Sequence, residues 1–100
     1  MRWTTLASAD FLDIFNGIAA ENPAAAARAG RQILDTVEML LDHPYLGKPG
    51  RSPDTREPGV ARFPYLVVYS VEAGAIASDP ARVAILRVLH GAMMWPPKDE

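Results

Sequence analysis

The chain of 100 residues contains no cysteine, which excludes disulfide bonds and thiolate metal sites. It also has no apolar run near the roughly 20 residues that a membrane-spanning helix needs. Its first five residues, Met1 to Thr5, do not begin the apolar core of a signal peptide. We therefore expect a soluble, cytoplasmic protein with no membrane partner, no metal and no other cofactor.

An excess of positive charge is missing as well, since the formal net charge is −2 at pH 7. Residues 1–47 carry three cations and six anions, whereas residues 48–100 carry seven cations and six anions. Four of those cations lie close together in the sequence, at Lys48, Arg51, Arg56 and Arg62. Because each phosphate contact needs its own cation, this modest patch predicts no tight direct binding to nucleic acid.

The composition and length of the chain are sufficient for one folded domain. Hydrophobic residues make up 49% of the chain and charged residues 22%, near the average of globular proteins. A chain of this length buries roughly 65% of its unfolded surface on folding. We expect residues 1–100 to form a single domain with one core.

The N-terminal part of the chain predicts a short strand and a helix. Residues 2–6 are rich in aromatic and β-branched side chains, which favours a strand. Ser8 is a candidate N-cap for a helix over residues 9–20, with Asp10 in its first turn. Apolar residues recur three and four positions apart along this helix, at Phe11, Ile14, Phe15 and Ile18.

A second helix follows at once and completes a helical hairpin. Asn22-Pro23 begins it, since asparagine is a good N-cap and proline is tolerated in the first turn. His43-Pro44 ends it, because the residue before a proline disfavours the helical conformation. An alanine run supports the helix, and its core-facing row is Ala26, Ala29, Ile33, Val37, Leu40 and Leu41.

The C-terminal part predicts strands. Prolines and glycines punctuate the segment after residue 44, so a strand near residues 55–62 should be short or lie at a sheet edge. Two apolar strands follow, over residues 63–71 and 83–91. The predicted class is α+β in the order β-α-α-β-β-β, with the helical hairpin packed on a small, largely antiparallel sheet.

Arg87 is the anomaly of the last strand. Strict alternation would place it on one face with Val83, Ile85 and Leu89, and would place His90 on the other. A guanidinium there must reach water, a carboxylate or a ligand. Arg87 is thus either solvated or salt-bridged, or part of a binding or catalytic site, and His90 is either structural or functional. For Tyr65 and Tyr69, core packing is favoured over a stacking platform.

Five segments in a fixed order now carry a resemblance. They are Asn22-Pro23, Pro44-Tyr45-Leu46-Gly47-Lys48-Pro49-Gly50-Arg51, Thr55-Arg56-Glu57, Pro64-Tyr65-Leu66-Val67-Val68-Tyr69 and Ile85-Leu86-Arg87-Val88-Leu89-His90-Gly91. With the predicted element order, they resemble the RelE/ParE superfamily of bacterial toxins over nearly the whole chain. This resemblance implies the toxin of a type II toxin-antitoxin module, neutralised by a small antitoxin whose C-terminal segment wraps the toxin.

Two mechanisms compete within that superfamily: RelE-like members cut mRNA on the ribosome, and ParE-like members poison DNA gyrase. Metal-free RNA cleavage needs a base, an acid and cations, which Arg56, Arg62, Arg87 and His90 could supply. The RelE-type pattern adds a strongly basic surface and a tyrosine near the C-terminus, and this chain has neither. The resemblance therefore favours a ParE-like gyrase inhibitor without catalysis of its own and with a ParD-like antitoxin, over an mRNA endonuclease.

Target binding is expected at the same polar residues and at an apolar C-terminal segment. Met93, Met94 and Trp95 stand where polar or basic residues often occur in the family, and they suit docking on a protein or covering the core. The predicted target-binding residues are therefore Arg56, Arg62, Arg87, His90, Met93, Met94 and Trp95. Pro58 is a second departure, because an apolar strand residue is more usual at that position of the family.

Antitoxin binding is expected on the first helix, at Phe11, Leu12 and Phe15. A helical partner needs an apolar strip with charged margins, and Leu12 lies beside the buried stripe with Asp13 and Glu21 nearby. The alternative for Leu12 is a place in the core. The alternative for the whole chain is a binding module that kept its antitoxin surface and lost toxicity.

Overall fold

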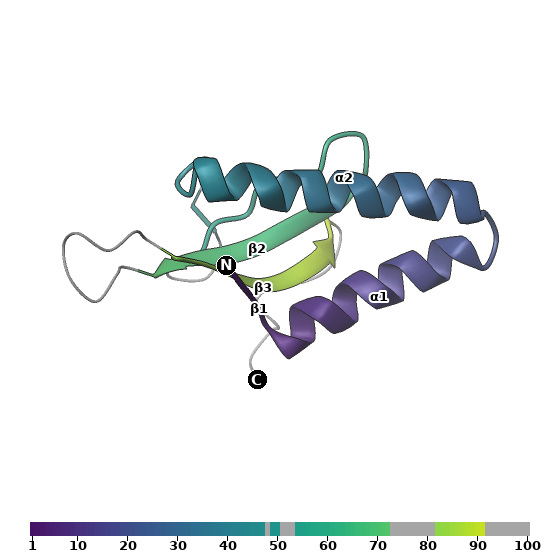
Figure 1. The fold of residues 1–100 in the computed structure, drawn as a ribbon, viewed down its shortest axis with the longest axis horizontal. Coiled ribbons are helices and arrows are strands. Elements are labelled where there is room, and N and C mark those ends of the chain that lie inside the picture. Colours follow the sequence, from purple (N-terminus) through teal and green to yellow (C-terminus); the bar gives the residue numbers. More distant parts are fainter. Residues whose placement is uncertain (48, 51–53, 73–81, 92–100) are drawn as a thin grey trace.

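The computed structural model describes residues 1–47, 49–50, 54–72 and 82–91. The elements follow in the order β1 (Arg2–Trp3), α1 (Thr5–Ala19), α2 (Pro23–Asp42), β2 (Tyr65–Glu72) and β3 (Arg82–His90). The two helices form a hairpin that packs on a sheet of three strands (Figure 1). The predicted α+β class with a helical hairpin on a small sheet is confirmed.

The sheet is mixed, with β3 between β1 and β2. β1 pairs with β3 in parallel, and β2 pairs with β3 antiparallel. In place of the edge strand expected over residues 55–62, isolated bridges join Arg56 to Tyr69 and Gly59 to Leu66. Pro58 accounts for this, because its carbonyl accepts from Val67 N at 3.0 Å but it has no N–H to donate.

A β-bulge in β3 corrects the predicted faces of that strand. Val68 is paired with Arg87 and Tyr69 with Ile85, so Leu86 has no partner on β2. An extra residue shifts the alternation by one position beyond it. Val88 accordingly joins Val83 and Ile85 in the hydrophobic core, although strict alternation would have put it on the opposite face.

Helix α1 begins earlier than the sequence predicts. Thr4, not Ser8, is its N-cap: the Thr4 hydroxyl accepts from Ala7 N at 3.1 Å and donates to the Leu86 carbonyl at 2.9 Å. Thr4 N also donates to the Ile85 carbonyl at 3.0 Å. The first strand therefore ends at Trp3, because Thr4 serves both the end of the sheet pairing and the start of the helix.

Helix α2 matches its prediction closely. The Asn22 side chain accepts from Ala25 N at 3.0 Å, and His43 is the C-cap. Five of the six residues predicted to face the core are buried: Ala26, Ala29, Ile33, Val37 and Leu40. The sixth was wrong, since Leu41 is 52% exposed. It lies 100° around the helix from Leu40 and turns away from the sheet.

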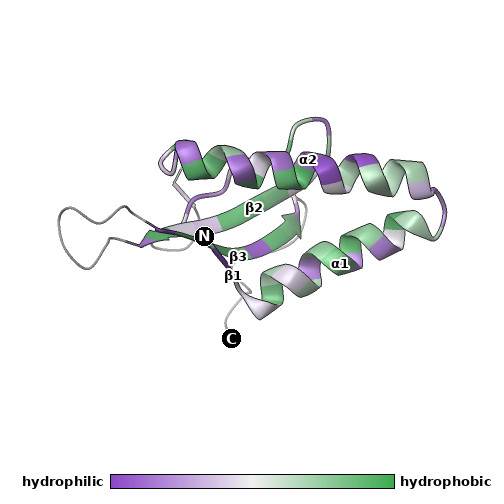
Figure 2. Ribbon diagram, in the orientation of Figure 1, coloured by the Kyte–Doolittle hydropathy of each residue, from purple (hydrophilic) through white to green (hydrophobic). Residues whose placement is uncertain are grey.

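The core lies between the helices and the sheet. Figure 2 shows β2 and β3 as largely hydrophobic, whereas each helix carries residues of both kinds. Ile33, Val37 and Leu40 of α2 pack there with residues of both long strands, Tyr69 among them. Tyr69 is fully buried, which confirms its predicted packing role. In α1 only Ala7 is buried, so the apolar stripe of that helix is half covered.

Candidate functional site

Tyr69 holds the segment that follows α2 against the sheet. Its hydroxyl donates to the Pro44 carbonyl at 2.7 Å and accepts from Gly47 N at 3.2 Å. A Cβ on Gly47 would lie 2.9 Å from Pro58 Cδ and 3.2 Å from the Tyr69 ring, so only glycine fits without displacement. This contact explains why a glycine follows Tyr45-Leu46, and it sets the position of Tyr45 on the surface.

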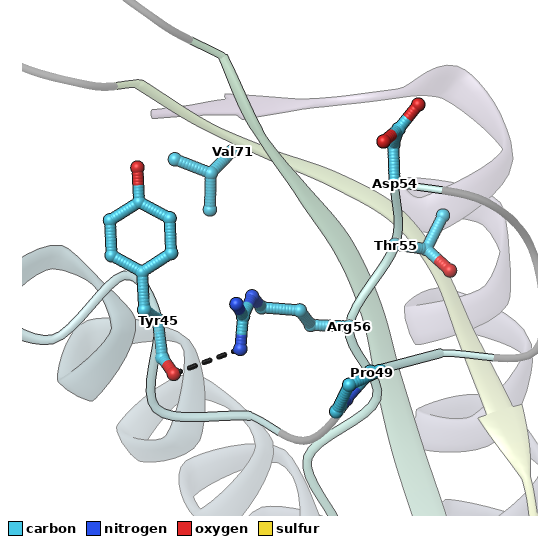
Figure 3. Close-up of a pocket in the computed structure, with 6 residues that line it drawn as sticks. All are labelled: Tyr45, Pro49, Asp54, Thr55, Arg56 and Val71. Carbon is cyan, nitrogen blue, oxygen red and sulfur yellow. Dashed lines mark hydrogen bonds between the residues drawn. The ribbon is translucent and has the colours of Figure 1, made fainter.

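Arg56 lies in a cavity of about 370 Å³ at the outer edge of β2. Figure 3 shows its guanidinium beside Tyr45, and the other lining residues are Pro49, Asp54, Thr55 and Val71. One guanidinium nitrogen, Nη1, donates to the carbonyls of Tyr45, at 3.0 Å, and Gly47. The charge also lies 5.2 Å from the centre of the Tyr45 ring, a cation–π contact. The predicted target-binding residue Arg56 is thus held by carbonyls and an aromatic ring, and among the described residues Nε and Nη2 have no acceptor.

Arg87 is paired with a carboxylate of α1. Arg87 Nε and Nη2 donate to the two carboxylate oxygens of Asp10 at 2.7 and 2.9 Å, and Asp10 also accepts from Val88 N at 3.0 Å. Hydrogen bonding to Asp10 raises the pKa of Arg87. The side chains are 21% and 14% exposed for Arg87 and Asp10. The ion pair between Arg87 and Asp10 therefore connects β3 to α1. Asp10 also accepts from Val88 N, a β3 donor that the short strand β1 does not reach.

The remaining polar residues of the predicted site lie elsewhere. Arg62 is exposed in the turn before β2, where it borders a different cavity from that of Arg56. His90 is exposed at the end of β3, with its ring edge-on to Tyr65 at a centroid distance of 5.9 Å. Met93, Met94 and Trp95 lie outside the described residues. The structure thus places Arg56, Arg62 and Arg87 against three different sets of neighbours.

A second candidate site is an apolar groove on the helical hairpin. It has a volume of about 330 Å³ and is lined by Trp3, Ser8, Phe11, Leu12 and Leu34. Leu12 is 56% exposed, so its predicted surface position is confirmed over the alternative of a core role. Phe11 packs edge-on against Trp3 at a centroid distance of 6.0 Å.

The two helices of the hairpin pack together beside this groove, at Gly30. A Cβ on Gly30 of α2 would lie 3.4 Å from the Phe15 ring and 3.5 Å from Phe11, so both rings of α1 pack on α2 at this residue. Phe15 thus packs between the helices, while Leu12 projects beyond them. Of the three residues predicted to bind an antitoxin, Phe11 and Leu12 line the groove and Phe15 supports it from inside the hairpin.

Neither a metal cluster nor a membrane helix is found in the described ranges. No group of three or more histidine, aspartate or glutamate residues is placed there to hold a metal ion. Within the same ranges, neither helix has the length and apolar character to span a bilayer.

Comparison with known proteins identifies the family. In fold, the chain is similar to a solved structure titled "Chromosomal ParDE TA system from P. aeruginosa", with a TM-score of 0.71 and 24% sequence identity over 87% of this chain and 89% of that chain. In sequence, it is 34% identical over 96 residues to "Putative toxin Y4kP" of Sinorhizobium fredii (strain NBRC 101917 / NGR234), covering 96% of this chain and 92% of that protein. The family model for the ParE toxin of the type II toxin-antitoxin system, parDE, matches residues 1–95. The chain therefore belongs to the ParE toxin family, and the resemblance seen in its sequence is confirmed.

Sequence reasoning missed two residues that the structure brings into contact with the candidate sites. Asp10 was assigned to the first turn of a helix, although the need of Arg87 for a carboxylate could have prompted a search for its partner. Arg28 was not singled out, and it borders the same cavity as Arg62. Its signal was weak, because an exposed arginine on a helix is ordinary.

Proposed function

We propose that this ParE family toxin inhibits DNA gyrase in the cytoplasm and that a ParD-like antitoxin neutralises it. The match to the ParE toxin family over residues 1–95 supports a gyrase target, which is typical of that family. The distribution of the arginines supports binding over RNA cleavage. A cleavage site made from the predicted set would bring Arg56, Arg62 and Arg87 around one phosphate, whereas Arg87 is engaged by Asp10 and the other two border separate cavities. We therefore assign the protein no cofactor and no chemistry of its own.

The apolar groove beside Leu12 carries the antitoxin part of the proposal. An amphipathic helix binds by laying its apolar face in such a groove. Leu12 and Leu34 remain 56% and 37% exposed at its border, and Trp3 and Phe11 line it. Covering an exposed leucine contributes roughly 1.5–3 kcal/mol, so a partner helix would gain affinity by covering these two.

The target is tested by two assays on the same purified protein. In the first, gyrase supercoils plasmid DNA and cleavage complexes are trapped; in the second, translating ribosomes are examined for cut mRNA. We expect gyrase inhibition with intact mRNA. Ribosome-dependent cleavage that His90→Ala abolishes would overturn the proposal in favour of the RelE-like mechanism. Normal growth of cells that make folded toxin without an antitoxin would instead support the non-toxic binding module.

The antitoxin groove is tested with Leu12→Asp. A carboxylate in place of the leucine should weaken antitoxin binding at least tenfold, because the partner would have to bury an unpaired charge. The matched control is Leu46→Asp, since Leu46 is 55% exposed and lies outside the groove. Both variants should melt near the wild-type temperature. Equal affinity of the two variants would remove Leu12 from the interface.

A further inference from the structure

A second groove, of about 360 Å³, lies between α2 and the turn that leads into β2. Figure 1 shows this turn rising beside the middle of α2. The α2 side is formed by Ala27, Arg28, Arg31 and Gln32, and the turn contributes Arg62 and Phe63. The groove therefore combines an aromatic ring with three arginines on a protein whose first half is otherwise acidic.

Two of these arginines, Arg28 and Arg62, form no ion pair within the described part of the chain. Arg31 donates to Asp35 through Nε at 2.8 Å and Nη2 at 2.6 Å, and it also contacts Glu38. In contrast, no hydrogen bond or ion pair joins Arg28 or Arg62 to another described residue, and both side chains are exposed. The groove thus presents two guanidinium groups whose donors are available to an anion.

The backbone of Arg62 gives an independent reason to assign it a role. Phe63 N donates to the Val60 carbonyl at 3.2 Å, which closes a tight turn with Arg62 in its third position. Arg62 has a φ of 68°, in the left-handed region. That position of a turn favours glycine or asparagine, and a long side chain is an outlier there. Keeping an arginine at a position where glycine would be less strained points to a function of the side chain.

We propose that this arginine groove binds an acidic segment of the antitoxin, with a carboxylate between Arg28 and Arg62 and an apolar neighbour on Phe63. The charge selects an acidic partner, and the net charge of −2 disfavours the phosphate backbone of nucleic acid. The antitoxin is the occupant we assign, because the arginine groove adjoins the apolar groove proposed for the antitoxin. Arg31 borders the arginine groove and lies about one helical turn from Leu34, which borders the apolar groove. One segment can therefore cross α2 from the apolar groove to the arginine groove. In naming the antitoxin as occupant, this inference rests on the proposed function.

The test measures the affinity of a cognate ParD-like antitoxin, purified and labelled with a fluorophore, for four forms of the toxin. Arg62→Gly and Arg28→Gln should each weaken binding about tenfold or more, since each removes hydrogen bonds to a charged group. The loss should shrink as ionic strength rises. The control, Arg82→Gln, removes the same charge from an exposed position on β3 and should leave affinity within about twofold of the wild type.

Thermal unfolding separates function from folding. Glycine adopts a positive φ without strain, so Arg62→Gly should melt at or above the wild-type temperature while binding more weakly. Equal affinity of wild type, Arg62→Gly and Arg28→Gln would overturn the arginine groove and leave the antitoxin partnership standing. An antitoxin that does not bind even the wild type would overturn the partnership itself. Variants that lose affinity for a DNA oligonucleotide but not for the antitoxin would assign the groove to nucleic acid and overturn the proposed occupant.

Discussion

The contact between Asp10 and Arg87 gives the sharpest test of how this fold is held together. The Asp10 carboxylate accepts three hydrogen bonds, two from Arg87 and one from Val88 N. Asp10→Ala removes both acceptor oxygens, so the Arg87 guanidinium and the Val88 N–H lose all three of these hydrogen bonds. Breaking a buried pair in this way costs about 3–5 kcal/mol. Because the two side chains are 21% and 14% exposed, water recovers part of that loss.

We therefore expect Asp10→Ala to lower the free energy of unfolding by about 2–4 kcal/mol. In a domain of 100 residues this corresponds to a fall in melting temperature of about 10–20 °C. Asp10→Asn should cost about half as much, since its carbonyl can still accept one of the hydrogen bonds. The measurement is urea unfolding followed by circular dichroism, with the slope of the transition checked for each variant.

A double-mutant cycle decides whether the pair acts as a unit. Arg87→Met removes the charge and keeps much of the volume, so the double variant Asp10→Ala/Arg87→Met should be more stable than the sum of the single losses implies. The raised pKa of Arg87 also predicts how the stabilising effect of this residue depends on pH. A cation with a raised pKa loses its stabilising effect only as the pH rises through that value, so the difference between wild type and Arg87→Met should stay constant from about pH 7 to 10. Single losses that add within about 0.5 kcal/mol would refute the coupling.

Two further predictions concern packing. Gly47→Ala should destabilise the protein by about 1–3 kcal/mol in urea unfolding, because its Cβ would lie 2.9 Å from Pro58 Cδ. Gly17→Ala should instead stabilise α1 by roughly 0.5–1 kcal/mol, because its Cβ would meet no atom within 4 Å. Loss of stability in both variants alike would contradict the close-approach argument. Tyr69→Phe should cost about 1–2 kcal/mol in the same assay, since the buried hydroxyl bonds both Pro44 and Gly47. An unchanged unfolding midpoint would show that the hydroxyl does not stabilise the loop after α2.

Local signals predicted most of the fold. Asn22-Pro23 marks the start of α2 and His43-Pro44 its end, because a cap and a proline act within one turn of the backbone. The start of α1 was misplaced at Ser8, since Ser8 and Thr4 are both good caps. What decides between them is the pairing of Thr4 with Ile85 and Leu86, more than 80 positions along the chain.

The candidate sites were predicted only where they depend on local features of the sequence. The exposure of Leu12 follows from the helical period of α1, which is a local property. The bulge at Leu86 and the carboxylate that meets Arg87 depend on how β3 fits between its neighbours. No spacing in the sequence reports these features, because residues that meet across a sheet share no period.

The sequence by itself determined that this chain is a small α+β domain of the ParE toxin family with a helical hairpin, an apolar strand pair and an arginine that needs a partner. These follow from caps, prolines and hydrophobic periods, which act between residues a few positions apart. Only the tertiary structure decided that Asp10 is that partner, that Arg56 and Arg62 border separate cavities, and that Arg28 borders the same cavity as Arg62. Such contacts arise when segments distant in the sequence are packed against one core, where the position of each side chain depends on all of its neighbours.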